Sequence, residues 1–441
     1  MAKVLVSFLG AALDGYKSAN YRFSDGKVIT STFIAEALSE YHQIDKMVLI
    51  GTAHSMWDEI YDVLGRDDIE NKEYIRDHLK EVCKASNHVK SELTQQDIKS
   101  IEEGLGDNAK VIIIKYGLDN KEIAFNTKEI FKLEEFLENG DHLYLDITHS
   151  FRSLPIYLIN CLIYLKNVCD KNLVLESISY GMLDVSREFP SGKKVSVGDK
   201  EVDEFLTPVV ELKKILDVQD WIIGAYNFKE FGNTYKIASL LEKDESGRYG
   251  SVATNIKEFA DVKNINYLNL YMNSADALQR LAKGDELPDM GKMVISPVMK
   301  DFVAQFPSGM RQSRYQFRMA KWHNARHNYG YALMLLVESV VSFTCEACRV
   351  DPNVRTKREW AKEVMKDYFE MLQPQDKKRV KKKYFGGVRW RMEAFCNEYI
   401  YIKEIRNKIA HNNPDLKLSS SQIVNAIENG LEFFNDYIDH K

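Results

Sequence analysis

The sequence contains few of the residues that interrupt helices and strands or form disulfide cross-links. Its 441 residues include 6 cysteines, 9 prolines and 23 glycines. So few prolines and glycines leave little room for long linkers or disorder. No run reaches the ~18 apolar residues of a membrane span, and the apolar N-terminal stretch lacks the cleavage site of a signal peptide. We therefore expect a folded, cytoplasmic protein.

The cysteines are scattered singly through apolar segments, except for Cys345 and Cys348. Two residues separate this pair, but the second pair of ligands that a zinc site needs is missing. We predict buried free thiols in a reducing compartment, with no bound metal and no cofactor.

Neither sign of charge dominates the whole chain, because 60 Lys and Arg residues stand against 65 Asp and Glu, a net charge of −5. This balance argues against a protein that coats nucleic acid along its whole surface. The distribution is uneven: residues 301–441 hold 24 basic and 17 acidic residues, whereas residues 1–300 hold 36 and 48. An anionic polymer is therefore expected to bind the C-terminal third, whose net charge is +7.

The chain is longer than the ~250–300 residues that one hydrophobic core supports, so two or three domains are expected. Its first 200 residues alternate strand patterns with amphipathic helix patterns. The predicted strands are Lys3–Leu9, Lys46–Ile50, Lys110–Lys115, His142–Ile147 and Leu173–Tyr180. This alternation implies an α/β domain with a mainly parallel sheet covered on both faces. A hairpin that turns at Ser191-Gly192 is predicted over Phe189–Val197.

From Asp203 onward nearly every pattern has the helical period. The longest predicted helices are Val209–Tyr226, Gln316–Cys348, Thr356–Leu372, Arg389–His411 and Ser421–Ile438. Glycine and proline cluster over Gly284–Gly309, which predicts a seam between a helical connector and a C-terminal helical domain. The predicted domains are therefore 1–200 (α/β), 201–300 (all-α connector) and 301–441 (all-α).

Small or polar residues follow three of the predicted strands. They are Gly10, Thr52 and the run Asp146-Ile147-Thr148-His149-Ser150-Phe151-Arg152-Ser153-Leu154-Pro155. Open parallel sheets bind ligands beyond the carboxyl ends of their strands. Glycine lets a backbone approach a ligand, hydroxyls suit phosphate oxygens, and an arginine can make two parallel hydrogen bonds to a phosphate.

These strand ends allow two other interpretations. A dinucleotide site is excluded, since the first loop lacks G-x-G-x-x-G and no P-loop occurs. The alternative is that Asp146, Thr148 and Ser150 merely cap a helix.

The run after the fourth strand, with Ser7-Phe8-Leu9-Gly10 and Tyr180-Gly181, resembles the CARF domain (CRISPR-associated Rossmann fold) of type III CRISPR ancillary proteins. The resemblance covers roughly residues 1–200 and implies a Rossmann-like fold. It also implies that two such domains pair and bind a cyclic oligoadenylate at their strand ends, with the tetra-adenylate favoured on resemblance alone. By resemblance, the residues lining this groove are Gly10, Thr52, Thr148, His149 and Arg152. Ser150 stands where the family usually has glycine.

The predicted helix Arg389–His411 ends in the string Arg406-Asn407-Lys408-Ile409-Ala410-His411. On an ideal helix, Arg406 and His411 are about 140° apart. Pro414 must end the helix nearby, which leaves His411 in an irregular turn from which it can approach Arg406. The simplest interpretation is a surface arginine and a histidine at the negative end of the helix dipole.

This R-N-x-x-A-H string, in a C-terminal helical domain, resembles the HEPN ribonucleases, whose R-x4–6-H motif forms the active site. A helix over Ala325–Phe343, which includes Glu338, resembles the first long helix of that fold. The resemblance implies a HEPN domain over 301–441 and a homodimer in which two motifs share a cleft. Its implied catalytic residues are Arg406, His411 and Asn407.

These residue types suit RNA cleavage, because histidine can transfer protons and arginine can stabilise a charged transition state. We expect metal-independent cleavage of single-stranded RNA to 2′,3′-cyclic phosphate and 5′-hydroxyl ends. Two alternatives stay open. One is a cyclic-oligoadenylate sensor or regulator without nuclease activity, although no helix-turn-helix pattern is evident. The other is a CARF domain that also degrades its activator with help from Ser7, Thr52 or Thr148.

A basic stretch, Lys377–Arg391, precedes the helix that carries the R-N-x-x-A-H string. Its commonest interpretation is a solvated surface loop. The aromatic residues interleaved with its charges would also suit single-stranded RNA, because bases stack on such rings.

Overall fold

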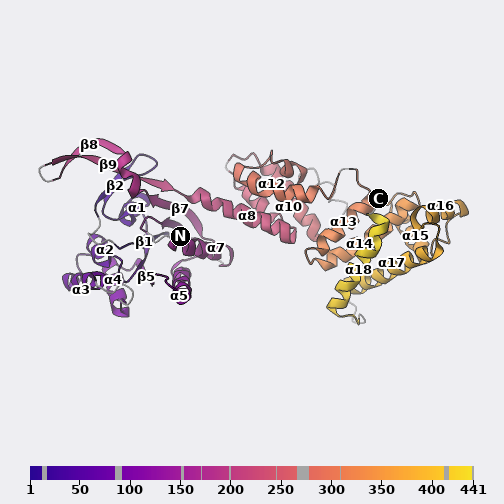
Figure 1. Ribbon diagram of the computed structural model, residues 1–441, viewed down its shortest axis with the longest axis horizontal. Helices are drawn as coiled ribbons and strands as arrows, with labels where there is room; N and C mark the ends of the chain where they lie inside the picture. The colour runs from indigo at the N-terminus through magenta and orange to yellow at the C-terminus, as the bar shows by residue number, and fades with distance from the viewer. Residues whose placement is uncertain are drawn as a thin grey trace. The chain divides into compact units, whose positions relative to one another are not determined.

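The computed structural model describes residues 1–441 except 12–16, 85–91, 150–152, 170, 198–199, 245, 266–277, 308, 412–416 and 440–441. The chain divides into two compact units, Met1–Leu216 (unit 1) and Asp217–Lys441 (unit 2). It passes from one unit to the other within helix α8, Lys213–Phe231. Figure 1 shows strands and helices in unit 1 and helices in unit 2.

Unit 1 is built around a mixed, mostly parallel sheet of nine strands among the described residues. The five predicted strands form its parallel centre, in the order β7-β6-β1-β4-β5. Their bounds are β1 Lys3–Leu9, β4 Lys46–Thr52, β5 Ala109–Ile114, β6 His142–Asp146 and β7 Val174–Gly181. The chain adds β4 and β5 on one side of β1 and then returns to add β6 and β7 on the other. The predicted α/β class is confirmed.

Helices cover both faces of this sheet, because successive side chains of a strand point to opposite faces. In β1, Val4, Val6 and Phe8 belong to a core with α5 to α7, whereas Leu5 and Leu9 belong to a core with α1 to α4. The bounds are α1 Ile34–His42, α2 Trp57–Leu64, α3 Lys72–Lys84, α4 Gln95–Leu105, α5 Asn120–Phe131, α6 Leu133–Phe136 and α7 Leu154–Asn167.

Four further strands extend the sheet beyond β7, and the sequence did not predict their pairing. The bounds are β2 Ala19–Arg22, β3 Val28–Ser31, β8 Pro190–Val197 and β9 Lys200–Glu211, and a short 3-10 helix covers Leu183–Glu188. β9 runs antiparallel to β7 and parallel to β2, and β3 closes the edge. The helix predicted to begin at Val209 therefore begins only at Lys213.

The predicted hairpin over Phe189–Val197 is wrong. β8 is one strand that pairs with β9, and Gly192 lies where the register shifts between Pro190 and Lys194. Gly192 has a φ of 79°, which a residue without a Cβ adopts at little cost. The glycine therefore accommodates a bulge within the strand instead of forming a turn.

Unit 2 is helical in its described residues. One continuous hydrophobic core runs from Trp221 to Ile438 and joins the predicted connector to the C-terminal helices. The bounds are α9 Tyr235–Glu242, α10 Gly250–Ile265, α12 Asp289–Val303, α13 Gln312–Asn324, α14 Tyr329–Ala347, α15 Arg355–Lys366, α16 Pro374–Phe385, α17 Arg389–Ala410 and α18 Ser420–Ile438. The boundaries expected near residues 200 and 300 stay predictions.

Two predictions for this half of the chain are wrong. The helix expected over Gln316–Cys348 is two helices, because His327 adopts a φ of 57° and the N–H of Asn328 bonds to the carbonyl of His323 at 3.0 Å. This geometry ends α13 with a Schellman-type cap. The basic stretch forms helix α16 and the start of α17 instead of a loop, whereas the expected seam at Gly284–Gly309, which contains helix α12, stays a prediction.

Within the described ranges, α14 is the helix whose length and apolar composition would allow it to cross a membrane, but 72% of its apolar window is buried inside the fold. Buried core helices of other folds often have the same length and apolar composition. All six cysteines are free thiols, and burial raises the pKa of Cys345 to about 11 and that of Cys348 to about 12.

Candidate ligand and catalytic sites

The carboxyl ends of β1, β4 and β6 lie level at one edge of the sheet in unit 1. Ser7 pairs in register with Asp146, and Leu9 pairs with Gly51. Gly10 and Thr52 therefore lie side by side at this strand-end edge, and Thr148 and His149 follow β6 at the same edge. The strand order reverses here, which is where an open parallel sheet binds its ligand. The fifth predicted groove residue, Arg152, lies outside the described residues.

Hydrogen bonds join the segments that follow β1 and β4. The Ser55 hydroxyl donates to the carbonyl of Leu9 at 2.6 Å and accepts from the N–H of Thr52 at 2.9 Å. The indole N–H of Trp57 donates to the carbonyl of Thr52 at 2.8 Å. Thr52 is only 2% exposed, so it shapes this edge more than it offers a hydroxyl to a ligand.

Asp146 anchors the other side of the same edge. It is fully buried, and its carboxylate accepts the O–H of Ser7 at 2.6 Å and the N–H of Thr148 at 2.9 Å. Burial raises the pKa of Asp146, while these hydrogen bonds favour its charged form and oppose that rise. The Thr148 hydroxyl accepts the N–H of Gly181 at 2.8 Å, which ties the end of β6 to β7.

Asp146 and Thr148 do not serve as the helix caps that the alternative interpretation expected. Helix α7 begins at Leu154, and the residue at its N-cap position, Ser153, makes no side-chain cap. Burial lowers the pKa of His149, and the charge of Asp146 acts in the opposite direction. His149 is therefore a neutral hydrogen-bonding group at neutral pH.

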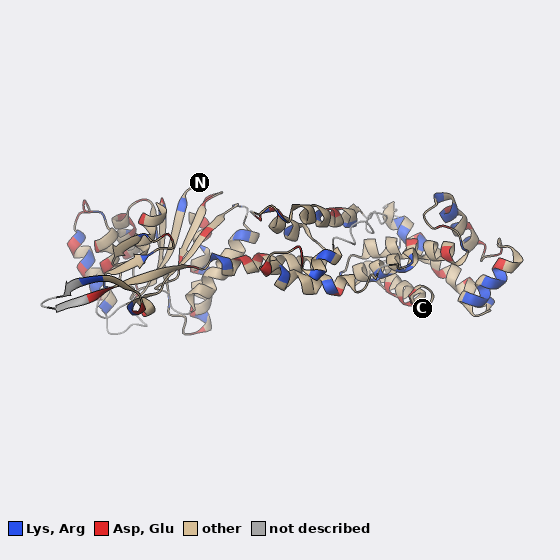
Figure 2. Ribbon diagram, turned by 90° about the horizontal axis from the view of Figure 1, so that it is seen from above, with Lys and Arg blue, Asp and Glu red and all other residues tan. Residues whose placement is uncertain are grey.

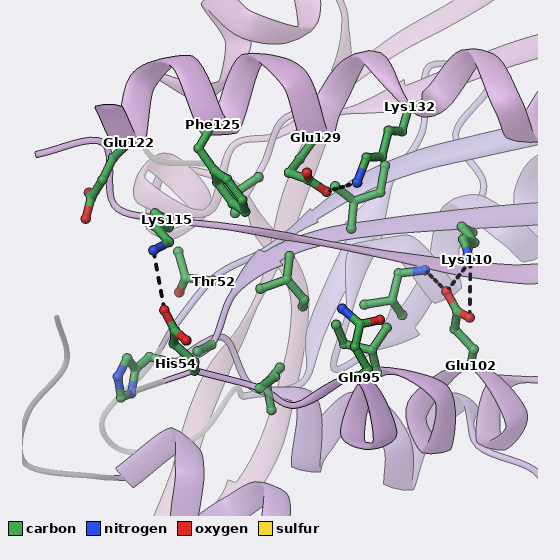
Figure 3. A pocket seen from close by; sticks show the side chains of 18 of the residues that line it. Thr52, His54, Gln95, Glu102, Lys110, Lys115, Glu122, Phe125, Glu129 and Lys132 are labelled. Atoms are coloured by element: carbon green, nitrogen blue, oxygen red, sulfur yellow. Dashed lines mark hydrogen bonds and ion pairs between the residues drawn. The ribbon is translucent and has the colours of Figure 1, made fainter. Parts of the chain in front are cut away.

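A groove of about 790 Å³ lies along β5, the outer strand on this side of the sheet. Figure 3 shows it between α4 and α5, with Thr52 and His54 at one end. Its three lysines are each paired with a glutamate, namely Lys110 with Glu102 at 2.9 Å, Lys115 with Glu92 at 3.4 Å and Lys132 with Glu129 at 2.6 Å. Because these charges are already compensated, the groove suits a phosphate less well than the strand-end edge does.

In unit 2, Arg406, Asn407 and His411 lie at the end of α17. The Nη2 atom of Arg406 is 3.8 Å from Oε1 of Glu338 on α14, and the Arg406 side chain is 25% exposed. His411 is exposed, and its backbone N–H donates to the carbonyl of Asn407 at 3.0 Å. Across the described segments, no hydrogen bond or ion pair joins Arg406 to His411. One chain therefore brings the two residues to one helix end without joining their side chains.

Sequence reasoning missed most of the network around Arg406. Glu338 also pairs with Arg358 of α15, which donates to the hydroxyl of Ser342 at 2.9 Å. Tyr399 lies two turns before Arg406 and is 1% exposed; burial and the charge of Glu338 raise its pKa. The signal that could have revealed this network is Glu338 itself, a charge in the middle of a mostly apolar helix.

No group of three or more His, Cys, Asp and Glu residues is placed to hold a metal ion in the part of the chain that the structure describes.

Comparison with known proteins identifies the domain that carries the strand-end edge. Residues 4–181 match the family described as "CRISPR system endoribonuclease Csx1, CARF domain". Residues 217–311 match the family described as "CRISPR-associated protein MJ1674, second domain". The chain therefore contains a CARF domain, and it is similar to CRISPR-associated proteins.

This CARF protein aligns with CRISPR-associated protein MJ1674 of Methanocaldococcus jannaschii at 30% identity over 434 residues, covering 93% of this chain and 62% of that relative. The chain thus spans less than two thirds of the relative's length. It is also similar to the solved structure of Enterococcus italicus Csm6 bound to cyclic hexa-2′-fluoro-hexa-dAMP, with a TM-score of 0.38 and 12% identity, covering 99% of this chain and 93% of that one. The HEPN resemblance of the C-terminal residues stays a prediction.

Proposed function

We propose that this CARF protein is a ribonuclease of type III CRISPR defence that a cyclic oligoadenylate activates. It would cleave single-stranded RNA at a composite HEPN site formed by two chains. The observation that carries the proposal is the Arg406, Asn407 and His411 cluster at the end of α17, in a helical unit that follows a CARF domain. The matched family, described as an endoribonuclease, supports it.

The activator would bind at the strand-end edge of unit 1. Gly10 offers backbone that a ring of nucleotides can approach, and Thr148 and His149 lie across from it on the loop after β6. Because burial keeps His149 neutral, that residue would contribute a hydrogen bond and no charge. Charge compensation for the phosphates would come from Arg152, which can bind a phosphate through two parallel hydrogen bonds.

In the proposed reaction the RNA supplies the nucleophile, its 2′-hydroxyl, which attacks the adjacent phosphate. His411 would transfer protons, Arg406 would stabilise the charge that develops on the phosphate oxygens, and Asn407 would orient the phosphate. Arg406 is turned towards Glu338, so its guanidinium must leave part of that ion pair when it binds the phosphate. A second motif, from the partner chain, would supply the groups that one chain does not bring together.

We expect Arg406→Ala and His411→Ala each to lower RNA cleavage by about 100-fold or more, the usual effect of losing a proton-transfer or charge-stabilising group. A fluorogenic RNA assayed with cyclic tri-, tetra- and hexa-adenylate gives the rates, and mass spectrometry identifies the ends. Glu404→Ala, an exposed change on the same helix, is the control and should leave cleavage unchanged.

Two outcomes would count against the proposal. Complete loss of cleavage in a chelator would contradict the metal-independent mechanism. If cells that carry the Arg406→Ala, His411→Ala double variant keep their full type III CRISPR defence, the protein is better described as a regulator without nuclease activity. Ser7 and Thr52 are each only 2% exposed, which counts against the alternative in which they help to degrade the activator.

A further inference from the structure

A strongly basic surface of unit 2 takes no part in the proposed reaction. Helix α16 carries six Lys and Arg residues and one Asp among its 12 residues, and Figure 2 shows this concentration of basic residues on one helix. The next helix, α17, begins with further basic and aromatic residues. We use the term α16 surface for the exposed residues Lys378, Lys382, Lys383, Trp390 and Arg391.

Part of the basic charge of α16 is structural. Arg379 donates to the backbone carbonyl at the end of α14 at 2.8 Å, and Lys377 forms an ion pair with Glu370. Val380 and Phe385 are fully buried in the core of unit 2. These contacts fix α16 to the helices beneath it, so the α16 surface is presented by an ordered helix.

The remaining charges of the α16 surface are not compensated. Within the described residues, Lys378, Lys382, Lys383 and Arg391 form no ion pair. Lys378 and Lys382 are one turn apart and share a face of the helix. The Arg391 guanidinium lies 5.6 Å from the ring centroid of Trp390, which is 63% exposed. An exposed indole beside uncompensated cations offers a base a stacking surface next to groups that bind phosphate.

We propose that the α16 surface is a second binding site for the RNA substrate, an exosite for single-stranded RNA. The lysines would contact phosphates, and a base would stack on Trp390, as in proteins that bind single strands. A duplex keeps its bases stacked inside and offers none to the indole. That the nucleic acid is RNA rests on the proposed function.

The α16 surface lies far from the predicted catalytic residues of its own chain. Trp390 and Arg406 both belong to α17 and are 16 residues apart, a rise of ~24 Å at ~1.5 Å per residue. At ~3.4 Å per stacked nucleotide, about seven nucleotides are needed to span this distance. The exosite therefore strengthens the binding of long RNAs and does not change the chemical step.

The test is a binding titration with the full-length protein and a 2′-O-methyl RNA of about 30 nucleotides, which lacks the nucleophilic hydroxyl and is long enough to reach both sites. In the triple-glutamine variant, Lys378→Gln with Lys382→Gln and Lys383→Gln, fluorescence anisotropy should show at least about tenfold weaker binding. The slope of log affinity against log salt should become about 2 less steep, at ~0.7 per phosphate contact. Trp390→Ala should weaken binding about tenfold with the slope unchanged.

The matched control is Lys80→Gln with Lys121→Gln and Lys128→Gln, the same loss of charge at exposed positions of unit 1. This control should bind RNA as the wild type does. Equal affinities and salt slopes for the control and the triple-glutamine variant would overturn the exosite. Tighter binding of a duplex, or of an acidic peptide, than of the single strand would overturn it as well.

Cleavage is measured separately, so that the two proposals fail independently. The triple-glutamine variant should raise KM for an RNA of about 30 nucleotides and leave kcat unchanged, while cleavage of an RNA of about four nucleotides should not change. If the wild type cleaves no RNA but the binding differences hold, the exosite stands and the proposed nuclease function is wrong.

Discussion

At the residue scale, burial determines the chemistry of several groups near the proposed sites. Asp146 is completely buried, yet it bonds to Ser7 and Thr148, so it fixes the geometry of the strand-end edge instead of facing a ligand. Arg406 shares Glu338 with Arg358, so part of its charge is already compensated. In both cases a polar side chain is positioned by its neighbours before any ligand binds.

His323 of α13 leads to a prediction about pH. It is 0% exposed, and neither ring nitrogen has a hydrogen-bond partner among the described residues. Burial, then the charges of Lys263 and Arg326, lower its pKa to about 3. In the unfolded chain the histidine binds a proton at about pH 6.5, whereas the folded protein does not. Stability should therefore fall as the pH drops from about 6.5 towards 3, by up to about 1.4 kcal/mol per pH unit.

Urea unfolding at pH values of about 7.5, 6 and 5 measures this dependence. In His323→Asn the slope of stability against pH should be shallower, whatever the variant's absolute stability. Equal slopes in the two proteins would show that His323 is not the buried neutral group that the structure describes.

At the element scale, the packing of α4 on α2 depends on a residue without a side chain. A Cβ at Gly104 of α4 would lie 2.0 Å from the ring of Tyr61, which is 0% exposed and belongs to the core beneath α2. Gly104→Ala should therefore destabilise the protein by about 1–3 kcal/mol, the usual cost of overpacking. Gly330→Ala in α14 is the control, because open space surrounds that position. Helix propensity predicts that this control gains up to about 1 kcal/mol in urea unfolding. Equal effects of the two substitutions would contradict the packing.

The five central strands could be predicted because each is an apolar run between polar turns, and parallel strands are buried on both faces. β2 and β3 could not, since each has four residues and Val28 is 44% exposed. β9 mixes charged and apolar residues without a regular alternation, and its partner β2 lies far away in the sequence. The break between α13 and α14 involves neither glycine nor proline, so only the φ of His327 reveals it.

The predicted site residues likewise follow from local sequence patterns, whereas the missed ones depend on contacts between distant segments. Gly10, Thr52 and Thr148 follow from one rule, that parallel strands end at a common edge. The Asp146 to Ser7 hydrogen bond depends on the register of β1 against β6, and the Arg406 to Glu338 ion pair depends on how α17 packs against α14. Sequence spacing contains no information on either contact.

At the scale of the whole molecule, two features limit what each part can do. They are the uneven distribution of charge along the chain and the single core that joins the predicted connector to the C-terminal helices. Residues 1–300 have a net charge of −12, so an anionic activator must be held by local donors and not by a broad positive field. Helix α8 spans the boundary between the units, and its Phe228 packs 5.3 Å from Phe302 and 6.1 Å from Trp322, between ring centroids. A displacement of α8 would therefore reach α13 through packed side chains.

The proposed assembly makes a prediction that concerns two chains at once. If cleavage needs the Arg406 and His411 motifs of both subunits of a homodimer, tenfold excess of the Arg406→Ala, His411→Ala variant should lower cleavage per wild-type chain about tenfold, since nearly every wild-type chain then pairs with an inactive one. Sedimentation of the mixture establishes that exchange has occurred, and the same excess of Glu404→Ala is the control. Unchanged cleavage in the exchanged mixture would contradict a composite site.

Cyclic tetra-adenylate at about 100 times its Kd should stabilise the folded protein by about 2.7 kcal/mol and raise the cleavage rate, because a ligand shifts an equilibrium only towards the state it binds better. An activator that stabilises the protein without changing cleavage would contradict the coupling between the CARF domain and the helical unit.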